Sequence, residues 1–233
     1  AEAVAIVRQG IRHIIWAGMG GSVQTVYCLK RMGYLDSPAL SIHPLDSTDP
    51  ASLNRTLREI ATHEALDSAA WSDESHQKQL LASTMMIGVS MGMTSEEPIT
   101  HLEWFDTLLR QAGVDDPGAR IQVMTLPGSY LDAFARLRGS RMTPIQLNGA
   151  NHTPATRVFL RPVALALAAR GLDAGQVAQR LHTLLGRAAT LGAATSVSKP
   201  SDSAFVRLGA MLAELTEFEG RNKVLVQTCL LYT

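Results

Sequence analysis

Several features that common protein classes need are scarce or absent in this sequence. The 233 residues include only two cysteines, Cys28 and Cys229, which cannot form a disulfide framework, so we expect a reducing compartment, the cytoplasm. Lys and Arg together number 21, as do Asp and Glu. This balance gives no electrostatic reason to expect a nucleic acid or an anionic membrane as a partner. No apolar run reaches the roughly 18 residues of a membrane span, and no signal-peptide pattern is present.

Sequence motifs for two common kinds of chemistry are absent as well. The nucleophile elbow G-x-S-x-G of serine hydrolases does not occur. The seven histidines show no metal-ligand spacing such as H-x-x-x-H beside a carboxylate, so we expect no metal site. We interpret His43 as a structural residue at the end of a strand, and His152 as either a loop residue or part of a ligand-binding crevice.

The sequence does contain enough apolar residues for a large core, in a pattern typical of an α/β protein. Hydrophobic residues make up 46% of the chain and charged residues 18%. Short apolar runs alternate with helix-like segments, which predicts a doubly wound, mostly parallel sheet with helices on both faces. The predicted strands are His13–Trp16, Ala39–Ile42, Met85–Val89, Gln122–Thr125, Pro144–Leu147 and, after a long gap, Lys223–Val226. The predicted helices are Ser22–Met32, Pro50–Ile60, Glu96–Gln111 and Ser129–Leu137, with further helices between Ala155 and Gly220.

The same pattern predicts how the chain is divided. We expect one α/β domain over residues 3–150, a helical connection over residues 151–220, and the start of a second α/β domain over residues 221–233. Both ends look cut, because residues 1–10 read as a helix already under way and "CLLYT" at residues 229–233 resembles a translated sequencing adapter. We therefore expect a fragment of a longer protein, with residues 229–233 artefactual.

The loop Gly18-Met19-Gly20-Gly21-Ser22 is the first segment that indicates binding. It lies between a predicted strand and a predicted helix, where unpaired backbone amides favour an anion. Gly20 and Gly21 allow a ligand to approach the backbone, and Ser22 adds a hydroxyl group. A tight strand-to-helix turn without a ligand could use the same residues, so this loop alone leaves both interpretations open.

A dinucleotide site is a weaker interpretation of the same loop. Its fingerprint G-x-G-x-x-G requires a third glycine, and Val23 occupies that position. Its acidic residue should follow the second strand, and Asp46 lies near that place. We expect His43-Pro44 to interrupt the strand before Asp46, which argues against a nicotinamide-dependent dehydrogenase.

A second loop, "SMGMTSEEP" from Ser90 to Pro98, follows the predicted strand Met85–Val89. Hydroxyl groups and a helix start without a lysine suit a phosphate monoester held by neutral donors; an ordinary capped helix is the alternative. Two such loops at the carboxyl ends of strands in one sheet predict a shared crevice. The residues that we expect to contribute from this loop are Ser90, Gly92, Thr94, Ser95 and Glu97.

Taken together, these segments resemble the glucose-6-phosphate (phosphoglucose) isomerase family, whose members contain sugar isomerase (SIS) domains. Gly18–Ser22 matches the G-x-G-G-S segment of the family, and Asp49-Pro50 matches its D-P helix start. Ser90–Glu97 matches a family loop of the type S-K-S-G-T-T-x-E. The segment "TRVFLRPVALAL" matches a later G-R-x-S segment with its helix, and Arg157 takes the arginine position. The resemblance extends over essentially the whole chain.

The resemblance implies a SIS fold, which is a flavodoxin-like three-layer sandwich, and a cytoplasmic enzyme of glycolysis and gluconeogenesis. The implied reaction interconverts glucose 6-phosphate and fructose 6-phosphate through an enediol, without a cofactor, in a homodimer when the protein is full length. Arg157 would neutralise the enediolate, and Glu97 would bind a sugar hydroxyl. The sugar phosphate would lie between two sets of residues: Gly20, Gly21 and Ser22 on one side, and Ser90, Gly92, Thr94 and Ser95 on the other.

The sequence departs from the family pattern at several positions. Met91 replaces a lysine, Gly92 replaces a hydroxyl residue, and Ala155-Thr156 replaces the paired glycines before the arginine. The family's general base is a glutamate in an E-S-x-G-K segment of the second SIS domain, and this sequence contains no such segment. A non-catalytic sugar-phosphate sensor with the same fold is therefore the alternative function.

Overall fold

The computed structural model describes residues 1–66, 74–90, 95–145, 155–195 and 203–217. These residues fall into two compact units, Ala1–Ala178 and Gln179–Thr233. The expected strand Lys223–Val226 lies outside the described residues, as do Gly92, Thr94 and His152.

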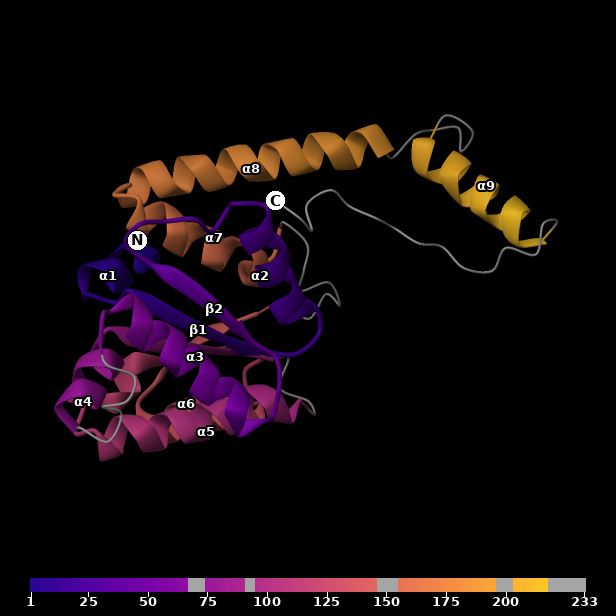
Figure 1. Cartoon of the computed structure of the whole chain (residues 1–233). Helices are drawn as coiled ribbons and strands as arrows, with labels where there is room; N and C mark the ends of the chain where they lie inside the picture. Colours follow the sequence, from indigo (N-terminus) through magenta and orange to yellow (C-terminus); the bar gives the residue numbers. More distant parts are fainter. Residues whose placement is uncertain (67–73, 91–94, 146–154, 196–202, 218–233) are drawn as a thin grey trace. The chain divides into compact units, whose positions relative to one another are not determined.

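The first unit is built on a five-stranded sheet in the order β2-β1-β3-β4-β5, in which all neighbouring strands are parallel (Figure 1). The order reverses at β1, because the chain goes from β1 to β2 on one side and then returns to β3 on the other. The carboxyl ends of β1 and β3 therefore lie at a topological switch point. The strands are β1 (His13–Gly18), β2 (Ser41–Leu45), β3 (Thr84–Val89), β4 (Ile121–Thr125) and β5 (Arg141–Pro144).

Helices cover both faces of this sheet, which confirms the predicted doubly wound α/β fold (Figure 1). Side chains of β1 alternate between the two faces, and all of them are buried because both faces are covered. One face carries α1 (Glu2–Arg8), α2 (Gly21–Arg31) and α7 (Arg157–Ala169). The other carries α3 (Pro50–His63), α4 (Glu74–Ala82), α5 (Glu96–Gln111) and α6 (Tyr130–Arg138), with a 3-10 turn η2 (Pro117–Arg120) before β4.

Two predicted strands are displaced in the structure. β2 continues through His43 and Pro44 to Leu45, so the expectation that His43-Pro44 interrupts this strand is wrong. Pro44 is accepted because β2 is an edge strand that pairs only with β1, and an edge position does not need the missing N–H. β5 ends at Pro144 instead of beginning there. It is an edge strand with exposed ends. Its residues are therefore partly polar and do not form the apolar run by which a strand is predicted from the sequence.

The helix α7 packs into the first unit against α1 and α2, and an ion pair between the buried Arg161 and the half-buried Glu2 fixes it there. Arg161 is 9% exposed and binds both carboxylate oxygens of Glu2, at 2.6 and 2.7 Å; it also donates to the side-chain oxygen of Gln122 in β4. Burial alone would raise the pKa of Glu2, but the hydrogen bond and charge of Arg161 outweigh it, and that pKa lies below its ordinary value.

The domain boundaries at residues 150 and 220 stay a prediction.

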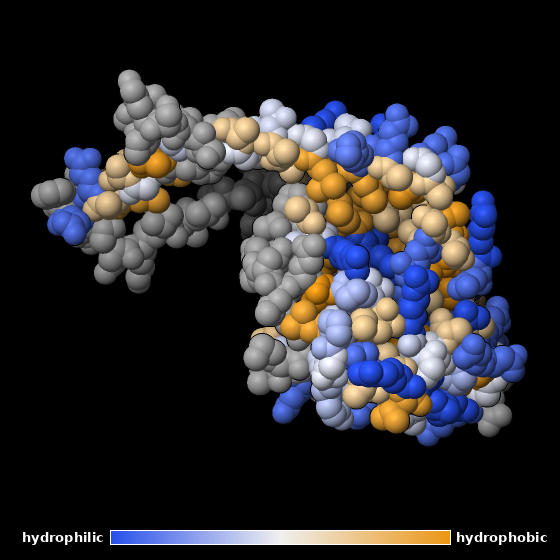
Figure 2. All heavy atoms as spheres, turned by 180° about the vertical axis from the view of Figure 1, so that it is seen from behind, coloured by the Kyte–Doolittle hydropathy of each residue, from blue (hydrophilic) through white to orange (hydrophobic). Residues whose placement is uncertain are grey.

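In the second unit the described helices are the later part of α8 (Ala174–Thr195) and α9 (Ala204–Glu217). α9 exposes Val206, Leu208 and Met211, and apolar residues are visible along it in Figure 2. Over the described part of the chain, no helix combines the length and apolar character needed to cross a bilayer.

Candidate functional site

The two strands that lead into the loops indicated by the sequence end side by side at the carboxyl edge of the sheet. β1 and β3 are parallel neighbours, and their last residues, Gly18 and Val89, are paired. The glycine-rich loop continues from β1 into α2, and the second loop leads from β3 to α5. The predicted adjacency is therefore confirmed for the ends of β1 and β3, which lie at the switch point of the sheet.

The glycine-rich loop is folded back on itself by the Ser22 side chain. The Ser22 hydroxyl donates to the Met19 carbonyl at 2.7 Å and accepts from the Met19 N–H at 3.2 Å. Its hydrogen is therefore engaged within the loop, and a ligand on this side would meet backbone amides first. Gly20 has a φ of 57°, a left-handed conformation that a residue with a side chain rarely adopts.

Gly18 allows this fold because it has no Cβ. A Cβ at Gly18 would lie 2.7 Å from the Ser22 hydroxyl oxygen and 3.3 Å from the Val89 carbonyl oxygen. The indole N–H of Trp16 donates to the Ser22 carbonyl at 2.9 Å and fixes the first turn of α2. Gly18 and Gly20 are thus needed for the fold of the loop itself, and the loop would keep this shape without a ligand.

The described part of the second loop places Ser90 and Ser95 at its two ends. Ser90 is buried, and its N–H donates to the Met124 carbonyl at 3.1 Å, which extends the pairing of β3 with β4. Ser95 precedes the first residue of α5. Glu97 is half-buried in the first turn of α5, where the helix dipole favours a carboxylate.

The helices that begin at these two loops differ from their neighbours in how they start. Side chains of Asp49, Ser129 and Thr156 cap α3, α6 and α7 by accepting from backbone N–H groups. Within the described ranges no side chain caps α2 or α5, although Ser95 stands at the capping position of α5. Among the described residues, Gly21 and Ser22 of α2 and Glu96 and Glu97 of α5 thus carry first-turn N–H groups that no described side chain caps, and such groups can bind an external anion.

His101 lies in α5 one turn after Glu97 and ties that helix to the loop after β2. It is fully buried, its Nε2 contacts the Ser47 carbonyl, and its ring meets Trp104 edge-on at 5.3 Å between centroids. Burial lowers the pKa of His101, although the Ser47 carbonyl and the charge of Glu97 act in the opposite direction. His101 is therefore neutral at pH 7 and packs α5 beneath the site.

Arg157 also stands at the carboxyl edge, at the start of α7 and beside the end of β5. It is exposed, and its guanidinium donates to the Pro144 carbonyl at 2.6 Å. Two strand positions separate β5 from β3 in the sheet. Arg157 therefore shares an edge with the two loops, while its described contact is with β5.

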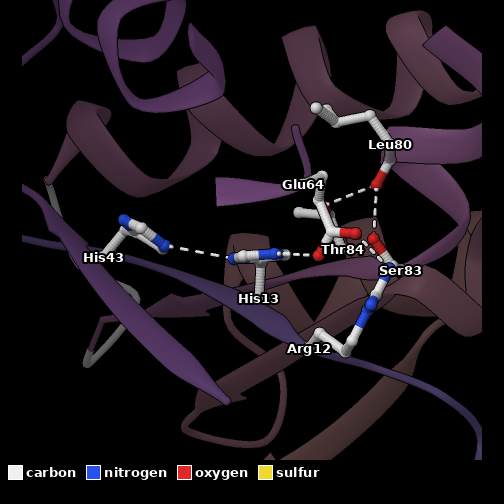
Figure 3. A network of polar contacts seen from close by, with 7 residues as sticks. All are labelled: Arg12, His13, His43, Glu64, Leu80, Ser83 and Thr84. Carbon is white, nitrogen blue, oxygen red and sulfur yellow. Dashed lines mark hydrogen bonds and ion pairs between the residues drawn. The ribbon is translucent and has the colours of Figure 1, made fainter. Parts of the chain in front are cut away.

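A histidine cluster lies elsewhere, at the amino end of β1 (Figure 3). His13 Nε2 contacts a Glu64 carboxylate oxygen at 2.7 Å, and Arg12 pairs with the same carboxylate. His13 Nδ1 lies 3.4 Å from His43 Nε2. Burial lowers the pKa of His13, and burial together with the charge of Lys30 lowers the pKa of His43 to about 3. No group of three His, Cys, Asp or Glu within the described ranges could hold a metal ion.

One polar cavity was not predicted from the sequence. It lies beside β2 and is lined by residues of α2, β2 and α3, among them Arg31, Asp46 and Arg55. These residues come from three elements at unrelated spacing, so no sequence motif could have indicated them.

Comparisons with known proteins agree with the resemblance seen in the sequence. No family model matches the chain. The glucose-6-phosphate isomerase of Synechococcus sp. (strain JA-3-3Ab) is 28% identical over 187 residues, which are 79% of this chain and 30% of that protein.

Solved structures show the same fold. A glucose-6-phosphate isomerase from Chlamydia trachomatis D/UW-3/Cx matches 93% of this chain and 36% of its own, with a TM-score of 0.63 at 21% identity. A hypothetical protein from Thermus thermophilus matches 91% of this chain and 44% of its own, with a TM-score of 0.60 at 20% identity. The chain thus spans less than half the length of each of these proteins. The predicted resemblance is confirmed: the chain is similar in sequence to the Synechococcus glucose-6-phosphate isomerase and shares the fold of the Chlamydia trachomatis enzyme.

Proposed function

We propose that this chain is the sugar-phosphate-binding part of a cytoplasmic glucose-6-phosphate isomerase, which interconverts glucose 6-phosphate and fructose 6-phosphate without a cofactor. The observation that carries the proposal is the pair of uncapped helix starts, α2 and α5, at the ends of adjacent strands. Two sets of backbone amides directed toward one switch point suit a dianionic phosphate. The likeness to the Synechococcus isomerase supports the choice of substrate.

In this proposal the phosphate is held between the two loops by neutral donors. The amides of Gly20, Gly21 and Ser22 approach it from α2, while Ser90, Ser95 and the loop amides approach it from β3 and α5. Because the Ser22 hydroxyl already donates to Met19, the backbone of this segment supplies the contacts. Gly92 and Thr94, which the sequence predicts to contact the phosphate, are also part of the proposed site.

Arg157 would act on the reacting atoms instead of the phosphate. A guanidinium stays protonated through the reaction and can stabilise the charge that builds on the enediolate oxygens. To do so it must leave the Pro144 backbone carbonyl that it now contacts. This carbonyl is a single neutral acceptor, and the Arg157 side chain is exposed. Glu97 would bind a sugar hydroxyl, and the general base would come from a part of the protein beyond this chain.

The experiment measures isomerisation of fructose 6-phosphate by the full-length protein and its variants. Ser90→Ala should weaken substrate binding by about 1–3 kcal/mol, the range for hydrogen bonds to a charged group, whereas Ser41→Ala, at the amino end of β2, should leave binding unchanged. Arg157→Lys should lower kcat more than it raises KM, because it removes a contact made in the transition state.

The alternative sensor function gives a different outcome of the same experiment. A full-length protein that binds a sugar-phosphate analogue through Ser90 but never turns over fructose 6-phosphate would be a sensor. A protein in which Ser90→Ala and Ser41→Ala bind the analogue equally would contradict the proposed site in either function.

A further inference from the structure

A cavity of about 590 Å³ lies beside the edge strand β2, between α2 and α3. Its volume is in the range of roughly 300–1,000 Å³ that is typical of sites for small molecules. It is on the outer side of β2, whereas the proposed phosphate site lies between β1 and β3. The cavity and the crevice are therefore separate sites.

An added β-strand is a poor occupant for this cavity, because the outer edge of β2 is already engaged. Pro44 has no N–H to donate. The Ile42 carbonyl accepts from the Lys30 ammonium at 3.1 Å, and the Pro44 carbonyl accepts from the Tyr27 hydroxyl at 3.4 Å. Side chains of α2 thus occupy the acceptors that a docking strand would need.

Six charged side chains line the cavity: Lys30, Arg31, Asp36, Asp46, Arg55 and Glu59. Lys30 donates to the Ile42 carbonyl and Glu59 lies 4.0 Å from His43, and three of the others could bind a ligand. Arg31 comes from the last turn of α2, Arg55 from α3, and Asp46 follows β2. Over the residues that the structure describes, none of these three makes an ion pair within 4.0 Å, and Arg55 donates only to the Ser52 hydroxyl, at 3.2 Å. Two guanidinium groups, one from each side of the β2 edge, are thus left to the cavity.

The Tyr27 phenol lies among these charges. Burial and the negative charge of Asp46 raise the pKa of Tyr27, while the charges of Arg55 and Arg31 act in the opposite direction. Guanidinium groups recognise phosphate and carboxylate oxygens with paired N–H donors. A carboxylate such as Asp46 accepts hydrogen bonds from hydroxyl groups. The lining therefore fits a molecule with an oxyanion at one end and hydroxyl groups at the other.

We propose that the cavity between α2 and α3 binds a small hydroxylated oxyanion, a phosphate ester or a carboxylate. Arg31 and Arg55 hold the oxyanion, and Asp46 accepts from its hydroxyl groups. Since the cavity is lined by residues other than those of the crevice, the proposal stands apart from the isomerase function and can succeed or fail separately.

The test follows the backbone amide signals of this chain by NMR during titrations with glycerol 3-phosphate, glycerate and inorganic phosphate. The amides of Tyr27, Asp46 and Ser52 should shift in a saturable way, and the tighter of the first two probes identifies phosphate ester or carboxylate as the preferred group. Arg55→Ala and Arg31→Ala should each weaken that binding about tenfold, as expected for the loss of a charged hydrogen bond.

Two control variants distinguish binding in this cavity from a general effect of surface charge and from binding in the crevice. Arg58→Ala removes an exposed charge of the same helix α3 that does not line the cavity, and it should leave the affinity unchanged. Ser90→Ala, in the crevice, should also leave it unchanged. Equal affinities of the Arg55→Ala and Arg58→Ala variants, or binding that only Ser90→Ala removes, would overturn the proposal.

Discussion

Replacing Gly18 with alanine should destabilise the protein through one identified contact, the Ser22 hydroxyl. The added Cβ would lie 2.7 Å from the Ser22 oxygen, so this side chain must rotate away and lose its hydrogen bonds to the Met19 N–H and carbonyl. At about 1 kcal/mol net for each bond, Gly18→Ala should lower the free energy of unfolding by about 2 kcal/mol. The remaining contact, 3.3 Å to the Val89 carbonyl, adds to this cost.

A double-mutant cycle isolates that contact. In a Ser22→Ala background the nearest side-chain atom to the added Cβ is the Cβ of residue 22, at 3.6 Å, an ordinary van der Waals distance. Gly18→Ala should therefore cost about 1–2 kcal/mol less in that background than in the wild type. Urea unfolding of the four proteins measures this coupling. Two single-variant costs that add to within about 0.5 kcal/mol would show that Gly18 and Ser22 do not interact as described.

Two further predictions concern buried groups away from the crevice. The pKa of His43 is lowered to about 3 in the folded protein from an ordinary value near 6.5, so the unfolded chain binds a proton that the folded chain excludes between these pH values. The contribution of His43 to the free energy of unfolding should be constant above about pH 7 and fall by about 2 kcal/mol between pH 7 and pH 5. Urea unfolding at several pH values measures this fall. A His43→Gln variant with the same acid sensitivity as the wild type would disprove it. On α7, Arg161→Ala should cost about 1.5–3 kcal/mol, the range for hydrogen bonds to a charged group, because the half-buried Glu2 then keeps only the exposed Arg141, at 3.0 Å, as a partner. Exposed Arg157→Ala should change stability by less than about 0.5 kcal/mol. Equal thermal midpoints for the two variants would contradict the described ion pair.

The sequence predicted those parts of the fold that depend on strong local patterns. β1 and β3 are buried on both faces and read as continuous apolar runs. The capped start of α3 was predicted from Asp49-Pro50, and Asp49 accepts from the Ala51 N–H at 2.9 Å. The adjacency of the strand ends that lead into the two loops followed from the parallel α/β pattern, since carboxyl ends of neighbouring strands share one edge.

The edge strands were predicted poorly because their pattern depends on what lies beside them. β2 has one paired side, so Pro44 is allowed within it, although a proline usually argues against a strand. The correction also changes one argument against a dinucleotide site, since Asp46 follows the end of β2 directly. The other argument stands, because Val23 is fully buried at the position where the fingerprint requires a glycine.

The roles of the loop residues could be predicted only in part. The sequence assigns Ser22 a hydroxyl that faces a ligand, whereas in the structure this hydroxyl closes the loop onto Met19. A local hydrogen bond of this kind depends on the backbone conformation at Gly20, which the sequence permits but does not specify. The sequence also could not predict that α2 and α5 lack side-chain caps. Ser95, for example, is a residue type that often caps a helix, but it does not cap α5 here.

The central claim, that a sugar phosphate binds at the uncapped starts of α2 and α5, is tested most directly by mapping its contacts. The backbone amide signals of this chain are recorded during titration with the non-reacting analogue 6-phosphogluconate. The claim predicts saturable shifts at Gly20, Gly21, Ser22, Ser95 and Glu96, and none at Ala51 or Asp132, whose amides are already capped in α3 and α6. Saturable shifts at the capped helices, with those of α2 and α5 unchanged, would contradict it.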